Sequence, residues 1–151
     1  MIELRRAEPE DASDLARLRA ASLAEQGYLP PAERLAFARR AADDLARMFG
    51  EDRLVAWLLV ADGAVVGTAC ANYFERLPFP DGTLHAELSG VYVEPPYRGA
   101  GHASRLVAAV VADIRSSAAR KTFLRPSPGA RSLYARLGFV DDATGVMSLG
   151  A

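Results

Sequence analysis

The residues best suited to chemistry lie where an apolar, β-type segment passes through two glycines into an amphipathic helix pattern. The segment ends at Val93, and the glycines are Gly99 and Gly101. The first N–H groups of a helix have no acceptor within it and stand at the positive end of its dipole. Glycines leave room for an anion beside those amides and permit the positive φ that such a turn needs. The spacing predicts a cradle for phosphate oxygens.

Two other interpretations of these glycines stay open. They could form a tight strand-to-helix turn that binds nothing, or they could belong to a dinucleotide site, since Gly99-x-Gly101-x-x-Ser104 approaches the G-x-G-x-x-G fingerprint. The third glycine is absent, and the acidic residue expected about 20 residues further on is replaced by Leu124 and Arg125. A dinucleotide-dependent reductase is therefore the lesser alternative.

The same stretch resembles the coenzyme A site of the GNAT acyltransferase superfamily. The family pattern is Arg or Gln, two residues, Gly, one residue, then Gly or Ala, and Arg98, Gly101 and Ala103 match it in order. A second motif of the family, a leucine-tyrosine pair followed by Leu-Gly-Phe, resembles residues 133–139. Two motifs in the correct order indicate the family more strongly than either alone.

The resemblance implies a fold, a co-substrate and a set of contacts. It implies one α+β domain over residues 1–151, in three layers, with a mixed and mostly antiparallel sheet whose central parallel strands splay apart between flanking helices. It also implies that acetyl-CoA is the co-substrate, with its pantetheine arm along the main chain of Val91 and Val93. The implied cofactor-binding residues are Val91, Tyr92, Val93, Arg98, Gly99, Ala100, Gly101, His102, Ala103, Ser104 and Ser127.

Two of these positions depart from the family pattern. His102 stands where relatives mostly carry an aliphatic side chain, and Ser127 stands where many carry an asparagine that contacts the cofactor. His102 could lie beside a phosphate, and Ser127 can still donate one hydrogen bond.

Transfer of an acetyl group to an amine requires a neutral amine and a stabilised thiolate. Glu87 is the first candidate for the base, because the resemblance places a carboxylate in this part of the fourth strand; a solvated strand residue is the alternative. His85 is the second candidate, although a surface position at the start of a strand is expected for it. Tyr134 aligns with the tyrosine that faces the sulfur in many relatives, and the alternative is simple packing on a short helix.

Composition limits the class of protein. The 151 residues fit one domain, half of them are hydrophobic, and 18 basic and 19 acidic residues are interspersed, which argues against nucleic acid as a partner. Cys70, the one cysteine, has no histidine near it and reads as a small buried residue rather than a nucleophile. The charged N-terminus and the short apolar runs predict a cytoplasmic protein without a membrane span. No metal-binding residues are expected.

Secondary structure follows from hydrophobic spacing and turn residues. Strands are expected over 2–6, 53–61, 64–74, 84–93 and 122–124, with helices after Pro9, from Pro31 to Gly50, after Gly101, and up to Leu137. Asp62-Gly63 predicts a hairpin turn. Phe139-Val140 with Gly145 to Leu149 predicts a closing hairpin, and residues 75–83 are expected to form a surface loop because of Pro78, Pro80 and Asp81-Gly82.

The sequence therefore predicts an acetyl-CoA-dependent N-acetyltransferase that acetylates a primary amine of a small molecule or peptide by direct transfer. A domain that binds acyl-CoA without turning it over is the alternative, and a homodimer is possible. The acceptor is expected between residues 27–33 and 75–83, where Tyr28, Leu29, Leu77 and Phe79 supply apolar contacts. Glu75 and Asp81 could attract an amine.

Overall fold

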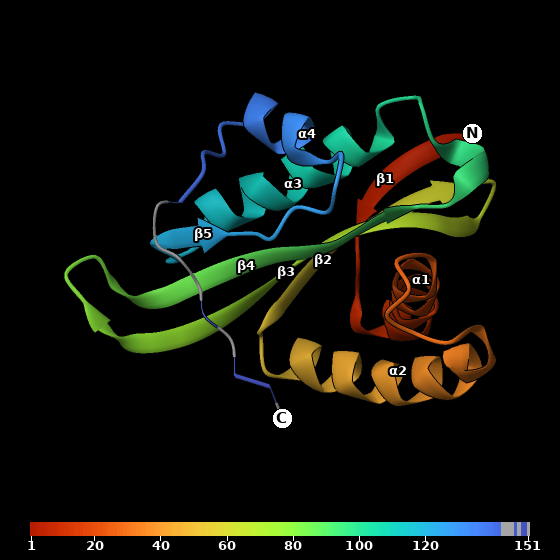
Figure 1. The fold of residues 1–151 in the computed structure, drawn as a ribbon, viewed down its shortest axis with the longest axis horizontal. Helices are drawn as coiled ribbons and strands as arrows, with labels where there is room; N and C mark the ends of the chain where they lie inside the picture. Colours follow the sequence, from red (N-terminus) through yellow and green to blue (C-terminus); the bar gives the residue numbers. More distant parts are fainter. Residues whose placement is uncertain (143–146, 148, 151) are drawn as a thin grey trace.

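The computed structural model describes residues 1–142, 147, 149 and 150. Five strands form one sheet in the order β1-β2-β3-β4-β5 (Figure 1). The strands are β1 (Ile2–Arg6), β2 (Leu54–Ala61), β3 (Ala64–Phe79), β4 (Gly82–Val93) and β5 (Lys121–Phe123). The α-helices are α1 (Ala12–Glu25), α2 (Arg34–Gly50), α3 (His102–Arg115) and α4 (Arg131–Arg136), with short 3-10 turns at Pro9–Asp11, Pro31–Glu33 and Pro95–Tyr97.

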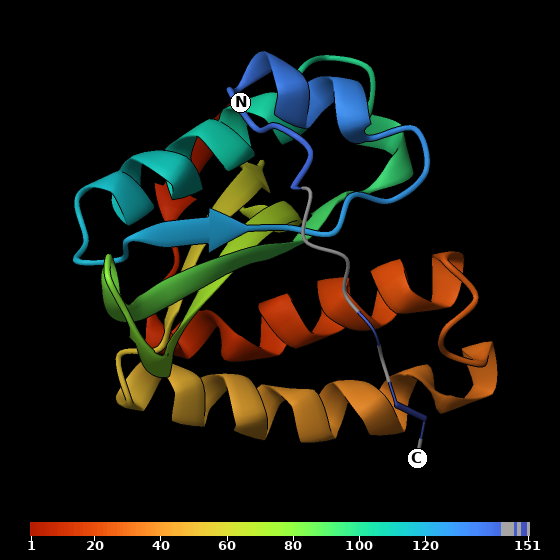
Figure 2. The same ribbon diagram turned by 60° about the vertical axis from the view of Figure 1, so that its left-hand side comes forward.

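The sheet is covered on both faces. Helices α1 and α2 lie on one face, and α3 and α4 lie on the other (Figures 1 and 2). Four residues of α3 at helical spacing are buried against the sheet: Leu106, Val107, Val110 and Ile114. On the opposite face, Leu15 and Leu18 of α1 pack against Leu58 of β2. The expected three-layer α+β architecture is therefore confirmed.

The β2–β3 hairpin forms where the sequence predicts it. Asp62 and Gly63 connect the strands with φ values of 49° and 82°, the positive pair that a two-residue turn between twisted strands requires. Residues of β2 alternate between the two cores, with Val55 and Leu59 on the α3 side and Leu58 on the α1 side. This antiparallel pair forms the rigid centre of the sheet.

Strand β4 contains a bulge that the sequence did not reveal. Thr68 pairs with Tyr92, while Cys70 pairs with Ser89, so two steps along β3 correspond to three along β4. The extra residue falls at Gly90, whose φ is 65°. A bulge re-aims the side chains that follow it, and here it turns the second half of β4 toward the start of α3.

The two parallel strands separate soon after they meet. Strand β4 pairs with β5 only at His85, Ala86 and Glu87, opposite Lys121 to Phe123. All other neighbours in the sheet are antiparallel. The expected splay between the central parallel strands is thus present, and it leaves the later half of β4 without β5 beside it.

The predicted surface loop at residues 75–83 is wrong. Strand β3 continues to Phe79 and β4 begins at Gly82, so this region is the tip of a long hairpin arm that projects beyond the rest of the sheet (Figure 1). Pairing of β3 with β2 ends at Asn72, and the register toward β4 is irregular before Phe79. Pro78 therefore lies where few ladder hydrogen bonds are required, which is where a strand tolerates proline.

The end of α4 also differs from expectation. Gly138, with φ 95°, ends the helix as predicted. Phe139 and Val140 lie in no strand. The Phe139 N–H instead donates to the Tyr134 carbonyl at 3.1 Å, a bond typical of a helix end, so the first arm of the closing hairpin is not formed. In the second arm, positions 145, 146 and 148 lie outside the described residues. None of the described helices is long and apolar enough to cross a lipid bilayer.

Candidate active site

The glycine turn has the geometry of an open anion cradle. Gly99 and Gly101 have φ values of 84° and 79°, a conformation that side chains with a Cβ rarely adopt. No described atom lies within 4 Å of where a Cβ would stand on either glycine. Gly101 is the N-cap of α3, so the amides from Gly101 to Ser104 have no acceptor within the helix. The turn therefore fits a diphosphate.

One edge of β4 is open along the half that leads to this turn. Pairing with β5 ends in the middle of β4, and no described strand covers residues 88–93 on that side. The N–H of Glu94 donates to the Val66 carbonyl on β3 at 2.9 Å. Main-chain groups of successive strand residues alternate in direction, so those of Val93 and Val91 point to the open edge. This is the direction in which an extended ligand would need them.

Arg98, the first residue of the family pattern, is held by protein groups. Its Nε donates to the Val93 carbonyl at 2.7 Å. Its two terminal nitrogens donate to the two carboxylate oxygens of Glu25, each at 2.8 Å. Its guanidinium carbon lies 5.3 Å from the centre of the Tyr92 ring. The side chain therefore connects the end of β4, the glycine turn and the end of α1.

The other predicted cofactor residues lie around the turn or across the splay from it. His102, Ala103 and Ser104 form the first turn of α3 and are half-buried. The Nδ1 of His102 lies 3.4 Å from a terminal nitrogen of Arg105. Ser127 is exposed in the connection between β5 and α4.

Glu87 lies on β4 where the parallel strands still pair. Its neighbours Ala86 and Leu88 belong to the core beneath α3, so alternation places Glu87 on the opposite face of the sheet. Its carboxylate accepts a hydrogen bond from Arg125 at 2.8 Å, and its side chain is 24% exposed. A partly buried carboxylate at the splay is suited to proton transfer, although it must exchange Arg125 for the amine.

The expectation of a surface position for His85 is wrong. Its residue is only 2% exposed, and neither ring nitrogen has a hydrogen-bond partner among the described residues. It lies between Phe74 of β3 and Lys121 of β5 in the sheet register, with its ring centre 6.1 Å from that of Phe74. The ring of Phe74 on β3 packs near the imidazole, and this contact between strands is not visible in the spacing of the sequence. His85 is therefore not exposed to an acceptor in this structure.

Tyr134 lies on α4, over the α3 face of the sheet. It packs edge-on against Phe139 with ring centres 5.9 Å apart. Burial raises the pKa of its phenol, so the hydroxyl stays protonated at neutral pH and can donate a hydrogen bond. Because Glu87 lies on the other face, the structure does not bring these two candidates side by side.

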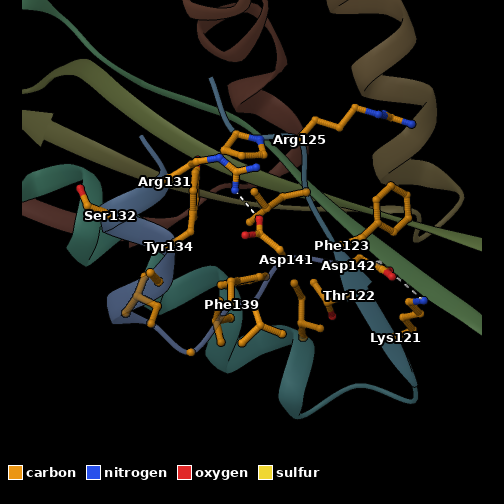
Figure 3. A pocket seen from close by; sticks show the side chains of 18 of the residues that line it. Lys121, Thr122, Phe123, Arg125, Arg131, Ser132, Tyr134, Phe139, Asp141 and Asp142 are labelled. Atoms are coloured by element: carbon orange, nitrogen blue, oxygen red, sulfur yellow. Dashed lines mark hydrogen bonds and ion pairs between the residues drawn. The ribbon is translucent and has the colours of Figure 1, made fainter. Parts of the chain in front are cut away.

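A broad pocket of about 1190 Å³ lies between α3, β5 and α4. Figure 3 shows that Thr122, Tyr134 and Phe139 lie on one side of β5 and that Phe123 and Arg125 lie on the other. The glycine turn does not line this pocket. This pocket is therefore separate from the glycine turn, and Tyr134 forms part of its wall.

The expectation that residues 27–33 and 75–83 enclose one acceptor site is wrong, because the α1–α2 connection and the tip of the β3–β4 arm lie at opposite ends of the molecule (Figures 1 and 2). The two segments also differ in burial. Leu29 is 8% exposed and anchors the α1–α2 connection, whereas Tyr28 is 77% exposed. On the arm, Leu77 is 86% exposed and Phe79 lies under Arg76, whose guanidinium carbon is 5.7 Å from the Phe79 ring centre. None of these residues lines the pocket between α3, β5 and α4.

Burial raises the pKa of the Cys70 thiol. A Cβ on Gly90 would lie 3.6 Å from its sulfur, so the side chain packs against the β4 bulge. A protonated, partly buried thiol is a poor nucleophile, in agreement with the structural role expected for this cysteine.

Sequence reasoning missed Glu25 and Arg125. Glu25 is 73 positions from Arg98, and no local pattern connects the end of the first helix with the glycine turn. Arg125 could have been found, because it follows the short strand whose Phe123 stands opposite Glu87 in the parallel register.

Comparison with known proteins gives the same assignment. The profile of the acetyltransferase (GNAT) family matches residues 18–139, and no curated protein matches the sequence. The fold is similar to that of a predicted acetyltransferase from Clostridium acetobutylicum solved with acetyl-CoA (TM-score 0.86, 21% identity, 99% of this chain and 96% of that one). It is also similar to a GCN5-related N-acetyltransferase from Ralstonia eutropha JMP134 (0.83, 20%, 99% and 99%).

A third similar structure is glucosamine-6-phosphate N-acetyltransferase from Arabidopsis thaliana (0.71, 16%, 99% and 98%). At these identities the structures establish the fold, whereas the family profile spans most of the sequence. Acetyl-CoA is the co-substrate of this family, and the open turn and strand edge described above fit it. The chain is therefore a member of the GNAT acetyltransferase family.

Proposed function

We propose that this protein is an N-acetyltransferase that moves the acetyl group of acetyl-CoA directly to a primary amine of a small molecule or peptide, with both substrates bound together. The observation that carries the proposal is the continuity of two open features. The unpaired edge of β4 leads through the short turn Pro95–Tyr97 into the glycine turn at the start of α3. A long ligand with an amide-bearing arm and a diphosphate needs both features in this order.

Backbone groups supply most of the contacts with the cofactor. Amides at Gly99, Ala100 and Gly101 and in the first turn of α3 bind the diphosphate, as helix N-termini do. Main-chain groups of Val91 and the N–H of Val93 bind the arm in the manner of an added strand, while the Val93 carbonyl stays bonded to Arg98. Ser127, from the other side of the splay, supplies a single hydroxyl.

Bound acetyl-CoA supplies an acyl group activated as a thioester. The attacking amine must be neutral, and for a lysine-like amine of pKa about 10.4 deprotonation at pH 7 costs about 4 to 5 kcal/mol. Glu87 takes up this proton as the C–N bond forms and the C–S bond breaks. An ammonium group that approaches Glu87 competes with Arg125 for the same carboxylate, so the acceptor displaces Arg125 before it reacts.

Tyr134 acts on the sulfur side. Full proton transfer from a phenol of pKa about 10 to a thiolate whose acid has pKa about 8.5 is uphill by about 2 kcal/mol. The raised pKa of the buried phenol adds to this cost. Tyr134 therefore donates a hydrogen bond to the leaving thiolate, which takes its proton later from solvent.

The acceptor reaches Glu87 from the side of the β3–β4 arm. The α1–α2 connection lies at the other end of the molecule (Figure 1), too far away to form the opposite wall of one small site. On the arm, Leu77 is exposed as an apolar contact, and Glu75 can attract an amine. One structural relative acts on glucosamine-6-phosphate, an amino sugar. A small polar amine of that kind is the first substrate class to test.

The test is release of free thiol from acetyl-CoA in the presence of a panel of amino sugars, polyamines and peptides. An N-acetyltransferase releases thiol only with particular amines and forms the acetylated product in equal amount. A protein that binds coenzyme A and releases no thiol with any amine would contradict the catalytic proposal and would leave a non-catalytic binding domain.

A further inference from the structure

Two ion pairs connect α1 to the segment that follows β4. The arginine lies on α1 in one pair and on the segment after β4 in the other. Arg17 of α1 donates to Glu94 at 2.8 Å, and Glu25 at the end of α1 accepts from Arg98 at 2.8 Å. The two helix residues are eight positions apart, which is about 12 Å along the axis. Helix α1 therefore holds this segment at two points, one at each side of the short turn Pro95–Tyr97.

The Arg98–Glu25 pair, which is the nearer to the glycine turn, has a defined geometry. Both terminal nitrogens of Arg98 face the two oxygens of Glu25, and Nε faces the Val93 carbonyl at 2.7 Å. One side of the planar guanidinium lies over Tyr92. A fork-to-fork pair of this kind fixes orientation in a way that a single contact does not. The carbonyl that it binds belongs to the open edge of β4.

A carboxylate beside an anion site repels the anion, so its presence there calls for another role. Glu25 neutralises Arg98, which directly precedes Gly99, and so weakens the attraction that Arg98 alone would exert on a diphosphate. We infer that Glu25 is a positioning residue: it locks Arg98 onto Val93, and this lock places the glycine turn so that backbone amides, rather than the arginine charge, bind the diphosphate. This inference rests on the proposed function, because it concerns the same cofactor.

The exposure of the Arg98–Glu25 pair indicates that it positions the glycine turn and does not stabilise the whole fold. The side chains of Arg98 and Glu25 are 42% and 48% exposed, and ion pairs this open contribute little to global stability. Loss of the pair should therefore leave the melting temperature nearly unchanged while it changes affinity for the cofactor.

The test is Glu25→Gln, which keeps the shape of the side chain and removes its charge. If Arg98 were chiefly a diphosphate ligand, the freed cation would bind coenzyme A more tightly. The positioning role predicts the opposite, a Kd for coenzyme A about tenfold higher by titration calorimetry at low salt. In steady state, KM for acetyl-CoA rises, while kcat and KM for the amine stay near their wild-type values.

Glu51→Gln is the matched control. Glu51 follows the end of α2 and pairs with Arg53 at 3.1 Å, so it is also a helix-end carboxylate beside an arginine, and it is remote in sequence from the glycine turn. Its substitution should leave the Kd for coenzyme A unchanged. A Glu25→Gln protein with unchanged or tighter binding would overturn the inference.

Arg98→Lys gives an independent check, because it keeps the charge and loses the fork. It should weaken coenzyme A binding about as much as Glu25→Gln, and the double variant should be little weaker than either single variant. Additive losses would mean that the two residues act separately and would refute the positioning role. Wild-type protein that fails to bind coenzyme A would instead refute the proposed function itself.

Discussion

The residues proposed to bind the cofactor and those proposed to bind the acceptor depend on different atoms. The first region, residues 91–104, presents main-chain amides and carbonyls fixed by a strand, two positive-φ glycines and a helix start. The second region, the tip of the β3–β4 arm, presents exposed side chains such as Leu77. A short sequence pattern determines the backbone geometry of the first region. Specificity in the second region depends on side chains, which need no fixed spacing along the sequence.

This difference explains why the sequence identifies the co-substrate and not the acceptor. A diphosphate recognised by amides requires only that the chain bend correctly at Gly99 and Gly101. An amine recognised by side chains can be bound by many residue types in many places. The experiments below test whether the two regions are as separate as the structure indicates.

The largest effect is expected at Gly101. Gly101→Val puts a β-branched side chain at φ 79° and closes the cradle, and loss of two charge-assisted hydrogen bonds weakens coenzyme A binding by about 100-fold or more, measured by calorimetry. Gly63→Val is the matched control, because Gly63 has φ 82° and equally open surroundings in the β2–β3 turn. If both variants bound coenzyme A equally well, the cradle would have no role.

The next largest effect concerns turnover. Glu87→Gln should lower kcat by about 100-fold or more, because it removes the proton acceptor, and the Kd for coenzyme A should change little. The measurement is the rate of thiol release with a saturating amine. Glu51→Gln, after the end of α2, serves as the control. A variant at Glu87 with normal kcat would show that solvent removes the proton.

A smaller effect is expected at the sulfur. Tyr134→Phe keeps the edge-on packing with Phe139 and removes one hydrogen bond to a developing anion, so kcat should fall about tenfold. Stability and coenzyme A affinity should stay the same. Unchanged kcat in a thiol-release assay would reduce Tyr134 to a packing residue.

A substitution in the acceptor region should change KM for the amine and not the affinity for coenzyme A. Leu77→Ser removes an exposed apolar side chain from the arm tip, and we expect KM for the amine to rise about threefold while the Kd for coenzyme A stays constant. Parallel titrations with amine and with coenzyme A measure the two. A change in coenzyme A affinity would show that the arm and the glycine turn are coupled.

The smallest effect is expected at Asp11, which lies outside both regions and should affect stability alone. Arg5 donates two hydrogen bonds to Asp11 at 2.8 Å and lowers the pKa of that carboxyl from 3.8. A depressed pKa means that the stabilisation is present above the unfolded value and is lost as the pH falls below about 4. Asp11→Asn should lower the free energy of unfolding by about 1 kcal/mol at pH 7.

In denaturant titrations this difference should shrink toward zero near pH 2, and coenzyme A affinity at pH 7 should not change. A constant difference across the pH range would mean that the Asp11 charge contributes nothing to stability.

The sequence predicts some parts of this structure well because they depend on local rules. The glycine turn, the Asp62-Gly63 hairpin and the Gly138 helix end each follow from φ requirements of a few residues. The apolar face of α3 follows from helical spacing. The resemblance to the GNAT family rests on the same local patterns, which is why the fold and the co-substrate were both expected correctly.

Other parts depend on contacts between distant segments. His85 is buried because β3 and β5 lie on both sides of it, and no local signal distinguishes that position from an exposed one. Pro78 suggested a loop, yet the arm beyond Asn72 has few ladder bonds to lose. The pairing of Glu25 with Arg98 joins residues 73 positions apart, so only the folded chain reveals it.

Hydrogen exchange of the backbone amides, with and without coenzyme A, tests the central claim most directly. If backbone groups bind the cofactor, coenzyme A should slow exchange at Val91, at Val93 and from Gly99 to Ser104, and should leave the tip of the β3–β4 arm unchanged. Unchanged exchange in residues 91–104 under saturating coenzyme A, or protection confined to another region, would contradict the account.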